Sequence, residues 1–378
     1  MDRIWGAFYG QIIGDALGSR YEFEKSKIVK NRIKSDKKYG FLGLFQKPFL
    51  PMLGVGLGDF KPGQFTDDSE MALSLARSIV EKQKFDQVDV ACSYAYWMET
   101  GPLTAGFATK NAFRNSMKTV TDNPLNPNWR TDLNDEQKQK VLDKILYNVR
   151  DYNGKSLSNG TLMRISPLAI AYRNSSPSEL RKLATLDTQI THCHPTAADA
   201  TSVYVIALAS LLNGNSREEA YNLALEHAET ELVKIHLNEA KKHPVPVKLP
   251  DNFKWQQPTV FDLHKPMEYT DGDDKAIGYT GVALQGAFYE LLHAESFSSG
   301  LENVISRGGD TDTNGCIAAS LLGAYFGVEN IPEDWIESVR KAEPYLGCRD
   351  HERTKVPMDF LSLKDVDELV PKLANICS

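Results

Sequence analysis

The sequence predicts an all-α protein that folds as one compact bundle of helices. Apolar residues recur at three- and four-residue intervals through almost all of the 378 residues, and alternating strand-like stretches are scarce. The hydrophobic share of 42% and charged share of 25% are those of a globular chain with a sizeable core. The length alone would permit one large domain or two ordinary ones. The segments around each long loop have the same helical character, so we expect one domain over residues 1–378, with a variable tail from about 342.

The N-terminal segment is expected to be a helix with two different stripes. Its apolar stripe consists of Ile4, Ala7, Phe8, Ile12, Ala16 and Leu17. Gly6, Gly10 and Gly14 form a second stripe, in which each glycine lowers helix propensity. Because glycine has no side chain, this stripe predicts that a neighbouring helix approaches closely.

The remaining chain alternates between helical patterns and three long loops. Apolar residues from Met71 to Ile79 predict a second amphipathic helix. Further helices are predicted at 87–99, 104–118, 136–150, 178–190, 196–212, 217–240, 276–294, 298–306, 313–327 and 333–341. The loops are the Gly/Pro-rich segment 39–64, the segment 119–135 and the Pro/Lys-rich segment 241–275. Loops this long in a compact domain usually serve function or move.

Composition restricts the classes of partner. A net charge of −7 disfavours direct nucleic-acid binding, which needs a concentrated basic face, but it leaves a phosphate-bearing small molecule open. No stretch approaches the roughly 18 uncharged apolar residues of a membrane span, and the N-terminus lacks the features of a signal peptide. The five cysteines are scattered and form no C-x-x-C pair, so neither a disulfide framework nor a zinc site is expected. We expect a cytoplasmic monomer without a membrane partner.

Two acidic clusters each precede an apolar run. The first is Thr66-Asp67-Asp68, and the second occupies residues 310–313. Taken singly, each cluster is typical of a helix N-terminus. Thr66 or Asp67 would cap, Glu70 follows Asp67 at the spacing of a capping box, and acids in the first turn suit the helix dipole.

Taken together, the clusters predict more than two caps. A cap needs one oxygen, whereas each cluster offers two carboxylates and at least one hydroxyl within four residues. Grouped carboxylates repel each other unless water or a cation screens them. Carboxylates and hydroxyls without a nearby cysteine suit hard cations such as Mg²⁺, Mn²⁺ or Ca²⁺ rather than zinc. Sequence alone cannot bring the clusters together, because they are far apart along the chain.

Four motifs in order resemble the ADP-ribosylglycohydrolase family, which includes dinitrogenase reductase-activating glycohydrolases and the ADP-ribosylarginine and ADP-ribosylserine hydrolases. Any one motif alone is weak, but their order and spacing from residue 6 to about 327 are specific. The motifs are Gly10-Gln11-Ile12-Ile13-Gly14-Asp15-Ala16-Leu17-Gly18 with Tyr21-Glu22-Phe23; Phe65-Thr66-Asp67-Asp68-Ser69-Glu70-Met71; Ser158-Asn159-Gly160-Thr161-Leu162-Met163-Arg164; and Gly308-Gly309-Asp310-Thr311-Asp312-Thr313.

The resemblance implies an all-α bundle with two Mg²⁺ ions in a cleft, for which Mn²⁺ is an alternative. The implied metal ligands are Thr66, Asp67, Asp68, Asp310, Asp312 and Thr313. Catalysis is assigned by resemblance to Glu22, Asp67 and Asp312, with Glu22 near the scissile bond in some family members. The other interpretation of Glu22 is a solvated acid past a helix end. Asp15 and Arg164 are expected to have supporting roles.

Substrate-binding roles are also implied by the resemblance. The turn Asn159-Gly160-Thr161 is similar to the family loop whose backbone amides hold the diphosphate, since glycine lets a ligand approach the backbone. His192 lies where the family often has a histidine-containing motif, so it either touches substrate or orients the site. Tyr279 could stack on adenine or ribose. An ordinary turn and a structural histidine remain the alternatives.

The resemblance implies a Mg²⁺-dependent hydrolase that removes ADP-ribose from a modified protein side chain, with arginine linkage as the first choice. Serine-linked ADP-ribose and free ADP-ribose derivatives are alternatives, so the partner is an ADP-ribosylated protein or an ADP-ribose-containing small molecule. A catalytically silent ADP-ribose-binding relative and a phosphoester hydrolase are further alternatives. The loop 39–64 and the tail 342–378 lie outside the motifs, and both leave the linkage open.

Overall fold

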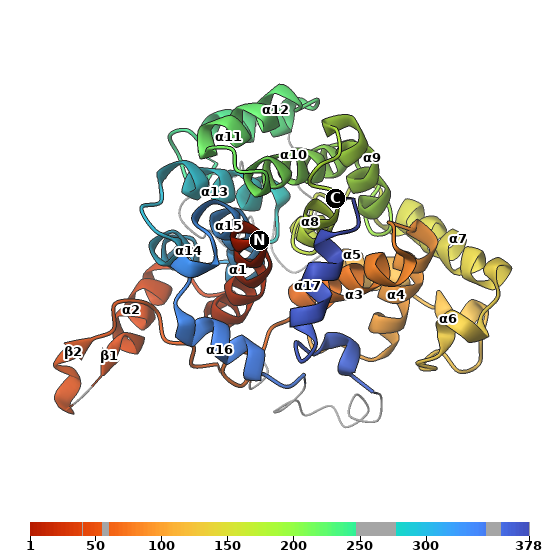
Figure 1. The fold of residues 1–378 in the computed structure, drawn as a ribbon, viewed down its shortest axis with the longest axis horizontal. Coiled ribbons are helices and arrows are strands. Elements are labelled where there is room, and N and C mark those ends of the chain that lie inside the picture. The colour runs from red at the N-terminus through yellow and green to blue at the C-terminus, as the bar shows by residue number, and fades with distance from the viewer. Residues whose placement is uncertain (40, 55–59, 247–276, 345–356, 378) are drawn as a thin grey trace.

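The computed structural model describes all residues except 40, 55–59, 247–276, 345–356 and 378, and it is helical as predicted (Figure 1). The helices are α1 (Asp2–Gly18), α2 (Ser26–Asp36), α3 (Asp67–Lys82), α4 (Gln87–Glu99), α5 (Phe107–Phe113), α6 (Trp129–Asp132), α7 (Asp135–Tyr152), α8 (Ser166–Ala171), α9 (Pro177–Thr188), α10 (Pro195–Leu212), α11 (Arg217–Glu226), α12 (Glu231–Glu239), α13 (Thr280–His293), α14 (Phe297–Ser306), α15 (Thr311–Phe326), α16 (Glu333–Lys341) and α17 (Val366–Ala374). The strands described are β1 (Lys38–Tyr39) and β2 (Phe45–Gln46), an antiparallel pair in which Lys38 faces Gln46.

The centre of the fold is an antiparallel pair formed by α1 and α15. Gly6, Gly10, Gly14 and Gly18 run along α1 at four-residue intervals, and each faces the backbone of α15. A Cβ atom at Gly6 would lie 2.1 Å from the carbonyl oxygen of Gly323, and one at Gly18 would lie 2.2 Å from that of Thr311. The predicted close approach is therefore confirmed. It sets the C-terminal end of α1 beside the N-terminal end of α15.

The other helices surround this pair. Helices α13 and α14 pack on α15, while α3 and α8 lie against α1 from the opposite part of the molecule (Figure 1). The apolar helix α10 packs on α9, α11 and α15. By length and composition α10 alone among the described helices could cross a membrane, but 89% of it is buried inside the molecule, which is typical of a central core helix.

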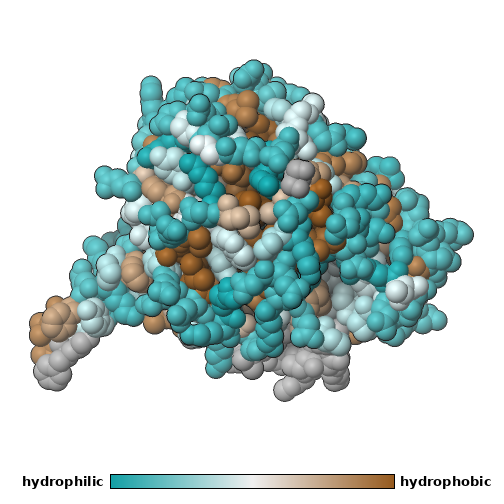
Figure 2. All heavy atoms as spheres, viewed as in Figure 1, coloured by the Kyte–Doolittle hydropathy of each residue, from teal (hydrophilic) through white to brown (hydrophobic). Residues whose placement is uncertain are grey.

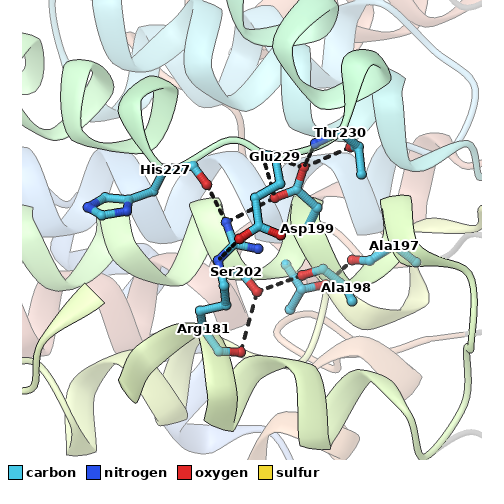
Figure 3. Close-up of polar contacts among 9 residues, drawn as sticks. Arg181, Ala197, Ala198, Asp199, Ser202, His227, Glu229 and Thr230 are labelled. Carbon is cyan, nitrogen blue, oxygen red and sulfur yellow. Dashed lines mark hydrogen bonds and ion pairs between the residues drawn. The ribbon is translucent and has the colours of Figure 1, made fainter. Parts of the chain in front are cut away.

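Two predicted helices are interrupted in the structure. The helix predicted at 104–118 ends at Phe113, and Asn115 has a left-handed φ of 56° that breaks the helical backbone. The helix predicted at 217–240 is two helices, because Asp199 of α10 binds the backbone between them (Figure 3). The Asp199 carboxylate accepts hydrogen bonds from the N–H groups of Glu229 and Thr230 and from the Thr230 hydroxyl, at 2.6–3.2 Å.

Several elements were not predicted. Helix α2 has few apolar residues, and only Ser26, Val29 and Ile33 of it are buried. The loops 39–64 and 119–135 contain the short β1–β2 pair and α6, respectively. The described part of the tail contains α17, which packs against α3, α8 and α1. The predicted loop 241–275 and Cys348 lie largely or wholly outside the described residues. The other four cysteines are free thiols in the described part of the chain.

Candidate active site

The first acidic cluster begins α3, but its own side chains do not cap the helix. Thr66 is the N-cap residue and makes no side-chain cap hydrogen bond. Instead, Asp15 of α1 accepts hydrogen bonds from the N–H groups of Thr66 and Ser69 and from the Thr66 hydroxyl, at 2.9–3.1 Å. Asp310, the N-cap residue of α15, makes no side-chain cap hydrogen bond either. The interpretation of the clusters as ordinary caps is therefore wrong for Thr66 and Asp310.

The two clusters meet in space, as a shared cation site requires. Asp15, Asp68 and Asp312 each present one carboxylate oxygen, and these oxygens lie within 4.8 Å of one another. A second triad with the same spacing consists of Glu22, Asp310 and Asp312, so Asp312 belongs to both. We call these five residues the carboxylate cluster. Asp15, expected only to support the site, is one of its members.

Burial makes the carboxylate cluster unfavourable without a compensating cation. Loss of hydration raises the pKa of Asp68 and Asp312 well above its usual range, and neighbouring carboxylates raise it further. Burial and then the charge of Asp310 raise the pKa of Glu22 to about 9. Burial likewise raises the pKa of Asp67 to about 6, although Thr104 donates a hydrogen bond that opposes the rise. A divalent cation bound there would stabilise the ionised carboxylates and so lower their pKa values.

The donor set fits a hard cation. It consists of carboxylate oxygens with the hydroxyls of Thr66 and Thr313 nearby in sequence, which are the ligands that Mg²⁺ prefers. The expectation that no cysteine lies nearby is wrong, because the Sγ atom of Cys316 lies 3.7 Å from Asp68 Oδ1. Burial and the neighbouring carboxylates raise the pKa of this thiol well above its usual range, which favours its protonated form.

Glu22 is held against the cluster by the backbone around it. The N–H of Phe23 donates to Gly309 O at 2.7 Å, and the N–H of Gly309 donates to Glu24 O at 2.9 Å. Gly308 has a φ of 74°, and a Cβ atom there would lie 2.4 Å from Glu24 O, so only glycine fits. Glu22 is only partly exposed, and its membership of the cluster contradicts the alternative interpretation as a solvated acid.

The turn Asn159-Gly160-Thr161 adjoins the same cluster. Asn159 Nδ2 donates to Asp310 Oδ2 at 2.8 Å, and its backbone N–H donates to Gly278 O. Asn159, Gly160 and Thr161 form a short 3-10 helix. A Cβ atom at Gly160 would meet nothing closer than 3.7 Å, so the fold itself does not demand glycine there. The absence of a side chain at Gly160 therefore leaves room for a ligand beside this backbone.

His192 and Tyr279 both lie next to Ser158, at the start of that turn. Both are fully buried. The His192 ring bonds to the hydroxyl of Ser158 at 2.6 Å through Nε2, and burial lowers its pKa to about 3, so the ring is neutral. The Tyr279 hydroxyl bonds to His236 at 2.9 Å. With no exposed ring, Tyr279 is not placed to stack on a ligand, and His192 is placed to orient the turn through Ser158.

Thr66 also borders a small cavity of about 20 Å³ beside the first cluster, roughly the space of one water molecule. Its polar lining includes Thr104 and Glu70, and Phe65 and Leu103 supply apolar walls. Asp67 lies at the edge of this region, with its backbone N–H 3.4 Å from Thr104 Oγ1. Thr104 lies outside every motif, and nothing in the sequence marks it.

Of the residues assigned by resemblance, Glu22, Asp68, Asp310 and Asp312 gather around one centre together with Asp15. Asp67 belongs to neither triad, and His192 and Tyr279 are fully buried. The sequence missed the central position of Asp15 because an acid in a glycine-rich helix is also typical of a buried supporting residue. Arg164, expected to be structural, is fully buried and pairs with Asp187 at 3.0 Å. Its guanidinium also donates to Thr191, whose hydroxyl contacts His192.

The chain is similar in sequence and fold to known proteins. The ADP-ribosylglycohydrolase family matches residues 1–366. Among curated proteins, the ADP-ribosyl-[dinitrogen reductase] glycohydrolase of Rhodospirillum rubrum is 27% identical, with 89% of this chain and 90% of that protein aligned. Human ADP-ribosylhydrolase ARH3 is 25% identical, with 94% and 91% aligned, and the ADP-ribosylarginine hydrolase Tri1 of Pseudomonas putida is 23% identical, with 90% and 74% aligned. A solved structure titled "ADP-ribosylglycohydrolase-related protein complex" has the same fold, with a TM-score of 0.63, 23% identity, and 100% of this chain and 98% of that chain covered.

Proposed function

We propose that this chain, which belongs to the ADP-ribosylglycohydrolase family, is a Mg²⁺-dependent hydrolase that removes ADP-ribose from a modified arginine side chain of a protein. Hydrolysis of an ADP-ribosyl glycosidic bond is the activity named in its relatives. The observation that carries the metal dependence is the pair of carboxylate triads that share Asp312. Arginine linkage is supported by the relative from Pseudomonas putida, which is named an ADP-ribosylarginine hydrolase. We also propose that the protein acts as a cytoplasmic monomer.

We assign the binding of the cations to residues at the start of two helices. Thr66, Asp67 and Asp68 at the start of α3 and Asp310, Asp312 and Thr313 at the start of α15 would hold two Mg²⁺ ions, with Mn²⁺ as a substitute. The ions, when bound, supply positive charge that orients ribose hydroxyls and polarises water.

The protein's own groups act on the bond. Breaking it places positive charge on the ribose, and the carboxylates of the cluster stabilise that charge. Glu22, held beside Asp310, is the group that donates or accepts the proton. The backbone of Gly160 and Thr161 binds the diphosphate through its N–H groups. Asn159 links that backbone to the cluster through its bond to Asp310, so substrate position and cation position are coupled.

The test is release of ADP-ribose from arginine-linked and serine-linked peptides, with Mg²⁺ and with EDTA. We expect Mg²⁺-dependent release from the arginine-linked peptide, and loss of release in Asp67→Ala and Asp312→Ala. The matched control is Asp151→Ala, because Asp151 is exposed and lies outside the cluster. Release that survives EDTA, or that survives both Asp67→Ala and Asp312→Ala, would refute the metal mechanism.

Other outcomes separate the alternatives. Release from the serine-linked peptide alone would replace the arginine assignment and keep the enzyme. Release only from free ADP-ribose derivatives would make a small molecule the substrate. Binding of ADP-ribose without release from any linkage would identify a catalytically silent relative.

A further inference from the structure

A basic, apolar-tipped arm projects from the molecule beside the carboxylate cluster. It comprises residues 25–47, which form α2 and the β1–β2 hairpin, and we call it the basic arm. In Figure 1 the hairpin extends away from the helical body, and in Figure 2 its end is a hydrophobic area. None of the four sequence motifs includes this arm.

The charge of the basic arm is opposite to that of the rest of the protein. Residues 25–47 contain seven lysines and one arginine against a single aspartate, a net charge of +7. Because the whole chain carries −7, the remainder carries −14. Lys27 and Lys34 are exposed and lie seven residues apart on α2, so they share one face of the helix. Lys38 extends this exposed basic surface onto β1.

The tip of the basic arm exposes large apolar side chains. Leu42 is 82% exposed, Leu44 is 72% exposed and Phe45 is 58% exposed. Tyr39 is also exposed, and its ring lies tilted against that of Phe45, with ring centroids 5.8 Å apart. Apolar groups gathered at the end of a projecting element favour contact with another molecule. The basic surface nearby favours a binding partner whose surface is acidic.

The root of the basic arm is fixed to the active site. The backbone of residues 23–25 pairs with Gly308 and Gly309, which immediately precede Asp310. Val29 and Ile33 are buried, and Lys37 pairs with Glu302 of α14 at 2.9 Å, so α2 is held in place. An 11-residue helix is about 16 Å long. The tip therefore lies beyond the reach of a small substrate bound at the cluster, whereas a protein bound there can contact it.

We propose that the basic arm is a docking element for the protein that carries the ADP-ribose, and that it binds an acidic surface with an adjoining apolar patch near the modified residue. This inference rests on the proposed function, since it assigns a recognition surface to the same site. Lys27, Lys34 and Lys38 attract the acidic surface, and Leu42, Leu44 and Phe45 enter the apolar patch. A neutral five-residue substrate gains nothing from either contact.

The experiment compares two arginine-ADP-ribosylated substrates, a neutral five-residue peptide and a folded acidic protein. The arm variants are L42S/L44S and K27E/K34E/K38E, whose side chains are exposed. The control variants are Leu125→Ser and Lys84→Glu, which are exposed positions on other parts of the surface. We expect kcat/KM for the protein to fall about tenfold in each arm variant, because removing surface contacts and steering charge slows productive encounter. For the peptide it should change less than about twofold. The loss in the lysine variant should shrink in high salt, and the loss in the leucine variant should persist.

Three outcomes would overturn the docking role. One is an equal change for peptide and protein, and another is no change for the protein. The third is arm-dependent sedimentation with phosphatidylserine vesicles while protein hydrolysis stays unchanged, which would make the arm a membrane-binding element. If the wild-type protein hydrolyses neither substrate, the proposed function fails. Calorimetric binding of the acidic ADP-ribosylated protein to wild-type and arm variants then decides the docking role by itself.

Discussion

The α1–α15 contact predicts that adding one methyl group to α1 lowers both stability and activity. In Gly10→Ala, an ideally placed Cβ atom would lie 2.2 Å from the carbonyl oxygen of Ala319 and 2.8 Å from its carbonyl carbon. Both neighbours belong to the backbone of α15, so no side chain can rotate away. The helices must separate by about 1 Å to restore an ordinary contact.

The energetic cost follows from this separation. Overpacking a closed contact costs roughly 1–3 kcal/mol, and more is expected when backbone opposes backbone. Alanine returns about 1 kcal/mol of helix propensity, so we expect a net loss of about 2 kcal/mol. With an unfolding entropy of about 2.1 cal/mol/K per residue, a chain of this length should lose about 2–3 °C in Tm.

The same separation should damage the active site, because the α1–α15 pair places Asp15 against Asp312. A misplacement of about 1 Å can cost on the order of 100-fold in rate. The assays are thermal unfolding in EDTA and in Mg²⁺, and Mg²⁺ titration of ADP-ribose release. The control is Gly106→Ala, where a Cβ atom meets nothing within 4 Å. If Gly10→Ala kept the wild-type Tm and Mg²⁺ dependence, the close approach of the helices would be wrong as the determinant of the site.

Three further predictions follow from single residues. Glu22→Gln, measured at saturating Mg²⁺, should lower kcat about 10²–10⁴-fold, and an unchanged rate would remove Glu22 from proton transfer. Arg164→Met leaves a buried carboxylate unpaired, so urea denaturation should show a loss of about 3–5 kcal/mol, whereas Lys372→Ala, from an exposed ion pair, should not differ from wild type. Burial lowers the pKa of His236 to about 4, so as pH falls below about 6.5 the unfolded chain takes up a proton that the folded chain refuses. Stability should therefore fall between pH 6.5 and 4, and His236→Gln should reduce this slope in Tm measurements.

The sequence predicted the elements that have strong local signals. The glycine stripe of α1 and the apolar periods of α3 and α4 predict real helices and, for α1, its close packing. Helix α2 gave no such signal, because its surface is mostly lysine and only one narrow face is buried. The break after Glu226 is also invisible locally, since it depends on Asp199 from another helix.

The sequence also predicted only part of the candidate site. Motifs identified which acids matter, but no local pattern could show which of them share a centre. Asp15 is the clearest example, because its position between Thr66 and Asp312 follows from the register of α1 on α15. His192 and Tyr279 show the converse limit, since a motif can name a residue without showing whether it faces the ligand or is buried.

The fold stabilises the negative charge of the carboxylate cluster in two ways, through helix dipoles and through hydrogen bonds. Both α3 and α15 begin there, and their N-terminal dipoles favour negative charge by about 0.3–1 kcal/mol for each group. Asp15 gains more, because it accepts hydrogen bonds from two backbone N–H groups and the Thr66 hydroxyl. Even so, burial still raises the pKa of Asp15 to about 7, and it raises the pKa of Asp68 and Asp312 well above the usual range of an aspartate. The helix dipoles and hydrogen bonds therefore do not offset the burial of these carboxylates, and all five members of the cluster present oxygen, so a hard divalent cation would complete the charge balance in the proposed mechanism.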